Sequence, residues 1–262
     1  MAALAASLNR VATVFESHAR TYRPTWRATV MVSFLNPVLF LLSMGVLLGK
    51  LVDAGNADLG GLSYMEFVAP GLLASTAMQV GTNEASFPVM AGLRWVKTYH
   101  AVVATPASVS ELVAGVFMWV AVRVIVSGIV FSAIAAAAGA FTSPLAVLAP
   151  GAALLCGLAF AAPLAALVGR LNNEQILTAV FRFALLPMFL FSGTFFPVSR
   201  LPDWLEPIAW ATPLWHGVEL CRDLAHGTAA AGATTIHIGY LACVILGGAA
   251  VAVHTMKGKL LS

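Results

Sequence analysis

The chain has 262 residues, of which 60% are hydrophobic and only 10% are charged, and its mean hydropathy is +0.90. Soluble domains carry roughly 25% charged residues, so this composition excludes a soluble globular enzyme and indicates a polytopic, all-α membrane protein. The formal net charge of +3 is small and dispersed along the chain, which argues against nucleic-acid binding.

The first 27 residues (1–27) predict an amphipathic helix that lies on the membrane surface. Leu8, Val11 and Phe15 recur at helical spacing, and Arg10 and Arg20 fall roughly on the opposite side. The alternative is a simple positively charged anchor for the first span.

Six stretches are long and apolar enough to cross a bilayer. A bilayer core about 30 Å thick needs roughly 20 apolar helical residues, so charge-free intervals predict spans. The interval between Arg123 and Arg170 is too long for one crossing, and turn-forming residues at 139–144 divide it into a helical hairpin. The predicted spans are residues 28–49, 64–90, 109–139, 145–169, 176–196 and 233–254.

Six spans place both termini on one side of the membrane, and the loop charges predict that this side is the cytoplasm. Lys and Arg in short loops favour the cytoplasmic face. The basic residues of the predicted inner segments are Arg10, Arg20, Arg23, Arg27, Arg94, Lys97, Arg170, Lys257 and Lys259. Those of the predicted outer segments are Lys50, Arg200 and Arg222.

The segment between the second and third spans predicts a short amphipathic helix parallel to the membrane. It ends at Thr105 and Pro106, because the residue before a proline is biased away from the helical region. Such a helix would present side chains to a soluble partner; the alternative is an interfacial loop anchored by Trp95 and Tyr99. One stripe of this helix consists of Leu93, Val96, His100 and Val103.

Residues 197–226, which precede the last span, predict short helices that dip into the outer leaflet. Their tryptophans suit the headgroup level, and their prolines suit helix starts. Non-helical backbone at membrane depth has to be buried in protein or face water, so this re-entrant element is expected to pack against the spans or line a cavity. Its candidate residues are Trp204, Trp210, Trp215, His216, Glu219, Arg222 and Asp223.

Polar residues in the spans are further candidates, because a charge at the centre of a membrane helix costs about 2.5–3.5 kcal/mol. Arg123 is expected to pair with Glu84 or Glu111, or to contact an anionic substrate. Arg182 is expected to snorkel to the membrane surface. The full set is Asn83, Glu84, Glu111, Arg123 and Arg182.

No catalytic or metal centre is predicted. The sequence contains no G-x-x-x-x-G-K-[ST] loop, so the chain does not bind ATP by that route. One group of residues would share a helical face suited to a metal ion, although pairing of its acids with Arg222 and solvent is the favoured interpretation. This group is His216, Glu219, Asp223 and His226.

The layout and three stretches of sequence resemble the permease subunits of ABC-2 type exporters, and more narrowly the group containing nodulation-factor and daunorubicin exporter permeases. The stretches are MEFVAPGLLASTAM (65–78), TPASVSELVAG (105–115) and SGTFFPVSRLPDWLEPIAWATPLWHGVELCRD (192–223). The last is the most specific, because FFPVS ends the fifth span and LP-x-WL and P-L-x-H follow. The resemblance covers nearly the whole chain.

This resemblance implies a coupling helix over residues 92–103 that docks on a separate ATP-binding subunit, with contacts from Arg94, Trp95, Lys97 and Tyr99. Members often carry glutamates before the Thr-Pro, whereas GLRWVKTYHAVVATP has no acid. Residues 197–226 would be the outer re-entrant helices.

The resemblance also implies an assembly of two ATP-binding subunits, which bind ATP and Mg, and two permeases, identical or related. This chain would bind no cofactor itself and would lie in the plasma (inner) membrane. Its almost wholly apolar spans favour an amphipathic or hydrophobic cargo, such as a drug, a lipid or a lipid-linked glycan.

Two other functions stay open. A membrane-embedded enzyme that modifies lipids would need paired carboxylates or a nucleophile at the interface, and the densest polar cluster is at residues 216–226. A secondary carrier driven by an ion gradient would be expected to show inverted repeats, and no convincing repeat is visible.

Overall fold

The structure is a computed structural model, which describes residues 2–24, 26–27, 35, 38–43, 49, 59 and 61–261. All secondary-structure elements within these residues are helices, as the sequence predicts. The first predicted span, residues 28–49, lies mostly outside the described residues.

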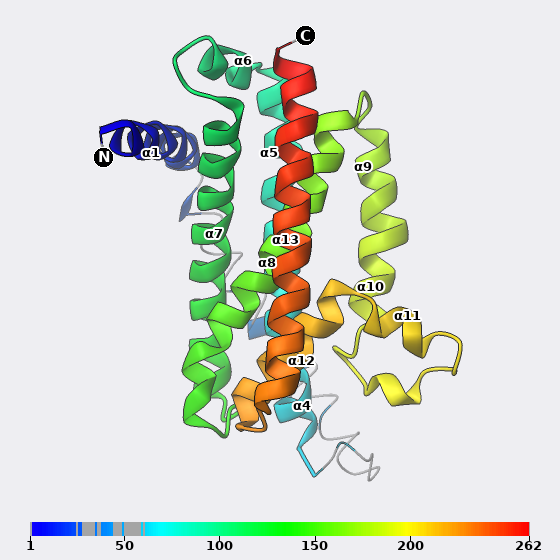
Figure 1. Cartoon of the computed structure of the whole chain (residues 1–262). Coiled ribbons are helices and arrows are strands. Elements are labelled where there is room, and N and C mark those ends of the chain that lie inside the picture. The colour runs from blue at the N-terminus through cyan, green and yellow to red at the C-terminus, as the bar shows by residue number, and fades with distance from the viewer. Residues whose placement is uncertain are drawn as a thin grey trace.

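Three of the described helices are long and apolar enough to span a membrane. The central one, α8, packs against both of the others (Figure 1). They occupy the ranges of the predicted third, fourth and sixth spans. They are α7 (Val109–Ala137), α8 (Ala149–Arg170) with the preceding 3₁₀ turn η3 (Pro144–Leu148), and α13 (Ala231–Leu260).

The ranges of the predicted second and fifth spans are each divided into more than one helix. Ser86 separates the first pair, and a π-helix joins the second pair. The fifth range ends at Phe191 rather than at 196, because Gly193 adopts a φ of 80° and turns the chain. The elements are α4 (Tyr64–Ala85) and α5 (Phe87–Met90), then α9 (Gln175–Val180), η4 (Phe181–Leu185) and α10 (Leu186–Phe191).

Capping boxes begin both α4 and α7. The Ser63 hydroxyl accepts from the backbone N–H of Glu66, and the Glu66 carboxylate accepts from the backbone N–H of Ser63. Ser108 and Glu111 form the same pair at the start of α7. Each box satisfies N–H groups that the first turn of a helix leaves unpaired, so an S-x-x-E pattern sets where each helix begins.

The remaining elements lie at the two ends of the bundle. One end, here called the α6 end, holds α1 (Ala2–Tyr22), α6 (Thr98–Val103) and the carboxyl terminus (Figure 1). The other end, here called the α11 end, holds η5 (Val198–Arg200) and α11 (Glu206–Trp210). From there α12 (Pro213–His226) packs against α4, α8 and α13, so the 197–226 segment is tied into the bundle.

Small residues let α8 approach its neighbours closely. Gly81 of α4 and Gly157 of α8 meet backbone to backbone, since a Cβ built on Gly81 would lie 2.3 Å from the Gly157 carbonyl oxygen. Ala161 and Ala165 of α8 are fully buried. Helices in membranes associate largely through such close van der Waals packing, so α8 is the centre of the core.

The contact between α8 and α13 gives a matched test with two adjacent glycines. A Cβ on Gly248 would lie 2.7 Å from the backbone nitrogen of Pro163, whereas nothing lies within 4 Å of one on Gly247. Gly248→Ala is therefore expected to lower the free energy of unfolding by about 1–3 kcal/mol. Gly247→Ala is expected to be neutral or stabilising by up to about 1 kcal/mol. Equal melting temperatures of the two purified variants in detergent would contradict this packing.

Candidate functional site

A buried ion pair connects α4 and α7. Arg123 Nε donates to Glu84 Oε1 at 2.9 Å, and the two side chains are only 13% and 17% exposed. Trp119 Nε1 donates to the other carboxylate oxygen at 2.9 Å. Of the two carboxylates named for Arg123, the structure therefore selects Glu84.

The end of α1 completes this cluster. Arg123 donates a second hydrogen bond to the Tyr22 hydroxyl at 2.7 Å, and its guanidinium carbon lies 4.4 Å from the centre of the Tyr22 ring. The Tyr22 ring also meets the Trp119 ring edge-on, at 5.4 Å. Arg123 is thus engaged by a carboxylate, a hydroxyl and an aromatic face, an arrangement that holds three helices together.

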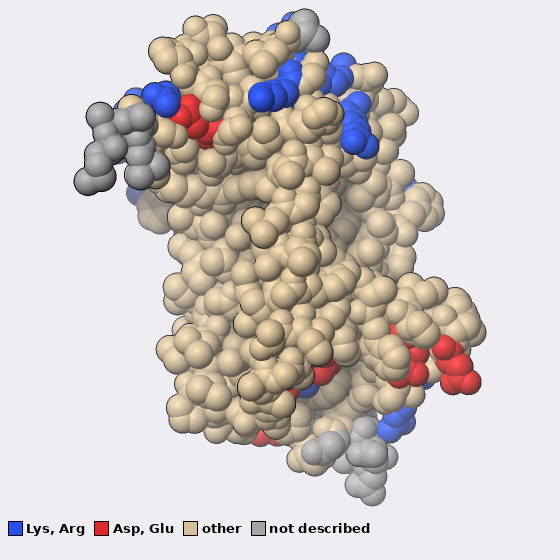
Figure 2. All heavy atoms as spheres, in the orientation of Figure 1, with Lys and Arg blue, Asp and Glu red and all other residues tan. Residues whose placement is uncertain are grey.

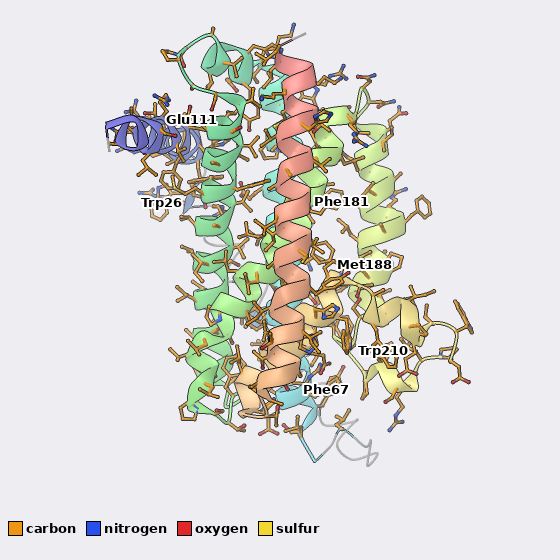
Figure 3. The ribbon with its side chains drawn as sticks, viewed as in Figure 1. Trp26, Phe67, Glu111, Phe181, Met188 and Trp210 are labelled. Atoms are coloured by element: carbon orange, nitrogen blue, oxygen red, sulfur yellow. The ribbon has the colours of Figure 1, made fainter. Side chains whose placement is uncertain are left out.

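The other carboxylate, Glu111, pairs with α1. Arg10 donates to both of its oxygens, from Nη2 at 2.6 Å and from Nε at 2.9 Å. Such two-point pairing is geometrically specific and stronger than a single neutral hydrogen bond. Arg10, predicted roughly opposite the apolar stripe of α1, is therefore paired with Glu111, which Figure 3 labels at the start of α7.

The contacts of α1 with α7 repeat at every fourth residue of both helices. Arg10 meets Glu111, the side chain of Val14 fills the space beside Gly115, and Tyr22 meets Arg123. His18 stacks on Trp119, with ring centres 6.3 Å apart. Residues four apart lie on one helical face, so α1 is seated on α7 over successive turns.

His18 also links α1 to α6 through Tyr99, whose ring centre lies 6.1 Å away. Burial lowers the pKa of His18, against the opposing negative charge of Glu84, so the imidazole is neutral at pH 7. Tyr99 is 3% exposed, its ring packs on Gly92, and burial raises its pKa. Tyr99, which was predicted to contact a partner, thus faces the core and anchors α6.

The single helix predicted over 92–103 is divided. Residues Ala91–Trp95 form the π-helix η2, which continues α5, and α6 begins only at Thr98. Between them Lys97 adopts a left-handed conformation, with φ 58°. Because of this break, the residues of the predicted stripe do not share one face: Leu93 is buried, whereas Val96 is 69% exposed. Trp95 beside it is 53% exposed and free to contact another molecule.

A hollow of about 600 Å³ opens at this break. Arg94 donates to the backbone oxygen and to the side-chain oxygen of Asn172, the latter at 3.3 Å. Lys259 Nζ donates to the same side-chain oxygen at 2.6 Å. The hollow thus brings together the 91–103 segment, the α8–α9 turn and the end of α13. Its lining residues are Met90, Leu93, Arg94, Trp95, Lys97, His100, Asn172, Asn173, Glu174 and Lys259.

Basic side chains dominate the surface around this hollow. Lys and Arg gather over the α6 end in Figure 2, and most of the visible Asp and Glu lie towards the α11 end. In the part of the chain that the structure describes, no carboxylate forms a salt bridge with Arg94, Lys97 or Lys259. Sequence reasoning missed Asn172 and Lys259, because only the fold brings three distant segments together here.

A second hollow, of about 400 Å³, lies between α4 and the η4–α10 segment. Asn83 lines it together with Gln79, one turn earlier on the same exposed face of α4. Phe181 and Phe189 line the opposite side, and Figure 3 shows Phe181 on the η4 segment. Arg182, which neighbours Phe181, is exposed. This face offers amide groups within an otherwise apolar surface.

At the α11 end, Arg222 of α12 holds the turn that follows α10. Its Nη1 donates to Glu219 at 2.5 Å, and its Nη2 donates to the carbonyl oxygen of Gly193 at 2.8 Å. The guanidinium carbon also lies 4.1 Å from the centre of the Phe67 ring on α4, which Figure 3 labels. Ser75 of α4 bonds Thr194 of the same turn at 3.0 Å. The turn is thereby fixed between α4 and α12.

Two histidines join α12 to α13. His216 Nδ1 and His237 Nδ1 lie 2.8 Å apart, and the Trp215 ring contacts both imidazoles. The Tyr240 ring stacks on His216 at 3.9 Å. The other tryptophans of this region, Trp204 and Trp210, are exposed.

The four residues considered for a metal ion do not converge. His216 faces His237, and Glu219 binds Arg222. Asp223 accepts from the Thr228 hydroxyl, and His226 contacts Thr142 and the carbonyl oxygen of Glu66. Within the described ranges, no group of three or more His, Cys, Asp or Glu side chains is placed to hold a metal.

Comparison with known proteins gives consistent matches. The family described as ABC-2 type transporter matches residues 10–225. Nodulation protein J of Rhizobium meliloti (strain 1021) is 28% identical over 223 residues, which cover 83% of each chain. Nodulation protein J of Rhizobium leguminosarum bv. viciae is 30% identical over 226 residues, 84% of this chain and 85% of that one. The protein of the same name from Sinorhizobium fredii (strain NBRC 101917 / NGR234) is 29% identical over 236 residues, 90% and 88% respectively.

Proposed function

Because the chain belongs to the ABC-2 type transporter family, we propose that it is the permease subunit of an ATP-driven exporter of amphipathic or hydrophobic molecules. Families of this kind pair a membrane permease with a separate ATP-binding subunit. The sequence itself has no phosphate-binding G-x-x-x-x-G-K-[ST] loop. ATP and Mg therefore bind the partner, and this chain converts the partner's movement into transport.

One observation carries the proposal: an exposed segment at the α6 end is rigidly joined to the bundle. Trp95 and Val96 face outward, while Tyr99, a few residues later, is buried against Gly92 and His18. A ligand shifts a conformational equilibrium only through contacts that differ between the two states, so force from a partner needs a stiff connection. The Tyr99, His18 and Trp119 contacts supply that connection to α1 and α7.

The arrangement also supports the proposed topology of six spans with both termini in the cytoplasm. The basic residues assigned to inner segments include Arg94 and Lys259, which meet at Asn172 at the α6 end. Arg222, assigned to an outer segment, lies on α12 and holds the turn after α10. The α6 end then faces the cytoplasm and the ATP-binding subunit.

The transport path is proposed to lie along the exposed face of α4 and the η4–α10 segment. Gln79 and Asn83 place amide groups in a hollow whose lining is mostly apolar and includes Met78, Leu185 and aromatic rings. Mixed amide and apolar linings suit amphipathic molecules, since few placed polar groups fix orientation within an apolar site. A second permease, identical or related, faces this surface and two ATP-binding subunits lie beneath, so that the path runs between the permeases.

Reconstitution tests the function directly. Vesicles containing this permease and its ATP-binding subunit are expected to move a fluorescent amphipathic lipid or drug in the presence of ATP and Mg. The same vesicles with an ATP-binding subunit lacking its phosphate-loop lysine are expected to show no movement. Transport by the permease alone under a proton or sodium gradient would contradict the proposal and favour a secondary carrier. Turnover of the lipid without ATP would favour a lipid-modifying enzyme.

A further inference from the structure

The hollow at the α6 end has the chemistry of a receptor for acidic side chains. We propose that it receives an acidic segment of the ATP-binding subunit, with Lys259 of α13 and Asn172 of the α8–α9 turn as parts of the docking surface. The inference rests on the proposed function and deepens it. It extends the contact from the 91–103 segment to two further parts of the chain.

The lining of the hollow carries more positive than negative charge. Arg94, Lys97 and Lys259 are cationic, and Glu174 is the one carboxylate in the lining of the hollow. None of these cations has a salt-bridge partner among the described residues. Complementary potentials across an interface steer association and exclude wrong partners, so this lining selects an acidic segment.

Asn172 orients two of these cations. Its side-chain oxygen accepts from Lys259 Nζ at 2.6 Å and from Arg94 Nη2 at 3.3 Å. Its backbone oxygen accepts a second Arg94 hydrogen bond. A neutral amide and a carbonyl hold the cations in place without cancelling their charge, so the remaining N–H donors stay available to a carboxylate. Lys97, whose backbone is left-handed, lines the same hollow.

The rim of the hollow adds an apolar anchor. Trp95 and Val96 are exposed, and Met90 and Leu93 contribute apolar lining beside them. Tryptophan and arginine are enriched among the residues that dominate protein–protein binding energy. The partner segment is therefore a protein surface with acidic side chains next to apolar ones, rather than a bare anionic headgroup.

Two lysines on the last turns of α13 give a matched test. Lys259 lines the hollow, whereas Lys257 is exposed and does not line it. In detergent, the purified ATP-binding subunit is expected to bind the Lys259→Glu permease about tenfold or more weakly than wild type. Lys257→Glu makes the same change of net charge and is expected to alter binding less than about twofold. Equal effects of the two variants would overturn the inference.

A cross-linking measurement on the wild-type complex removes any dependence on variant folding. A carbodiimide activates a carboxylate, and a lysine amine in contact then displaces the activating group to form an amide. Mass spectrometry is expected to find an amide between Lys259 or Lys97 and an Asp or Glu of the ATP-binding subunit. Cross-links confined to other lysines would overturn the inference.

The outcomes separate this inference from the proposed function. If the ATP-binding subunit binds the wild-type and the Lys259→Glu permease equally well, the proposed acidic docking is wrong, whereas the proposed permease function is unaffected. If the subunit does not bind wild type at all, the proposed function falls. If Lys259→Glu weakens only the binding of vesicles that contain phosphatidylglycerol, the hollow is a lipid site and the inference is overturned.

Discussion

Replacing Glu84 with leucine is expected to lower the free energy of unfolding by about 3–5 kcal/mol, because it leaves the buried Arg123 charge without its carboxylate. The Trp119 N–H loses its acceptor at the same time. Thermal unfolding of the purified variant in detergent measures the loss.

The exposed pair of Glu16 and Arg20 is the matched control. Its side chains are 59% and 77% exposed, so Glu16→Leu is expected to change stability by less than about 1 kcal/mol. A double variant, Glu84→Leu with Arg123→Met, removes both charges and is expected to recover at least half of the loss. An equal loss in the double variant would show that the apolar replacements, and not the unpaired charge, cause the effect.

Reversing the charges of Arg94 and Lys97 together is expected to uncouple ATP hydrolysis from export. The Arg94→Glu, Lys97→Glu permease places two carboxylates in a hollow that has no partner for them except Lys259 and His100. We expect cargo movement to fall by at least about tenfold while the ATP-binding subunit keeps its own basal hydrolysis. Vesicle transport and phosphate release, measured on the same preparation, separate the two activities.

The control for this experiment reverses two charges that do not line the hollow. Arg170 and Lys257 are both exposed and stand outside its lining. Arg170→Glu with Lys257→Glu is expected to keep export and transporter-stimulated hydrolysis near wild type. Unchanged export and unchanged stimulated hydrolysis in the Arg94 and Lys97 variant would remove both residues from the mechanism.

Sequence patterns predicted the features of the fold that depend on local chemistry. Predicted spans coincide with α7, α8 and α13, because a long apolar helix satisfies its own backbone hydrogen bonds within lipid. Because charged residues are rare within membrane spans, Arg123 was predicted to need a partner. Its observed partner, Glu84, is one of the two carboxylates proposed for it.

Features that depend on tertiary contacts were not predictable in the same way. The stripe from Leu93 to Val103 assumed regular α-helical spacing, whereas a π-helix and a left-handed Lys97 interrupt it. Tyrosine is a residue type typical of interfacial anchors, whereas the burial of Tyr99 depends on its contacts with Gly92 and α1. Asn172 carries no sequence signal of its own, since its role comes from two cations that approach from α13 and η2.

The spacing of the contacts between α1 and α7 limits how the two helices can slide. Arg10, Val14, His18 and Tyr22 contact α7 on successive turns, so a small axial displacement misaligns all four contacts together. The next register lies a full turn away, about 5.4 Å along the axis. There Arg10 would face Gly115 and lose its carboxylate. The amino-terminal helix therefore has a single favourable register on α7 and does not slide gradually along it. It either moves with α7 as one body or detaches from it altogether.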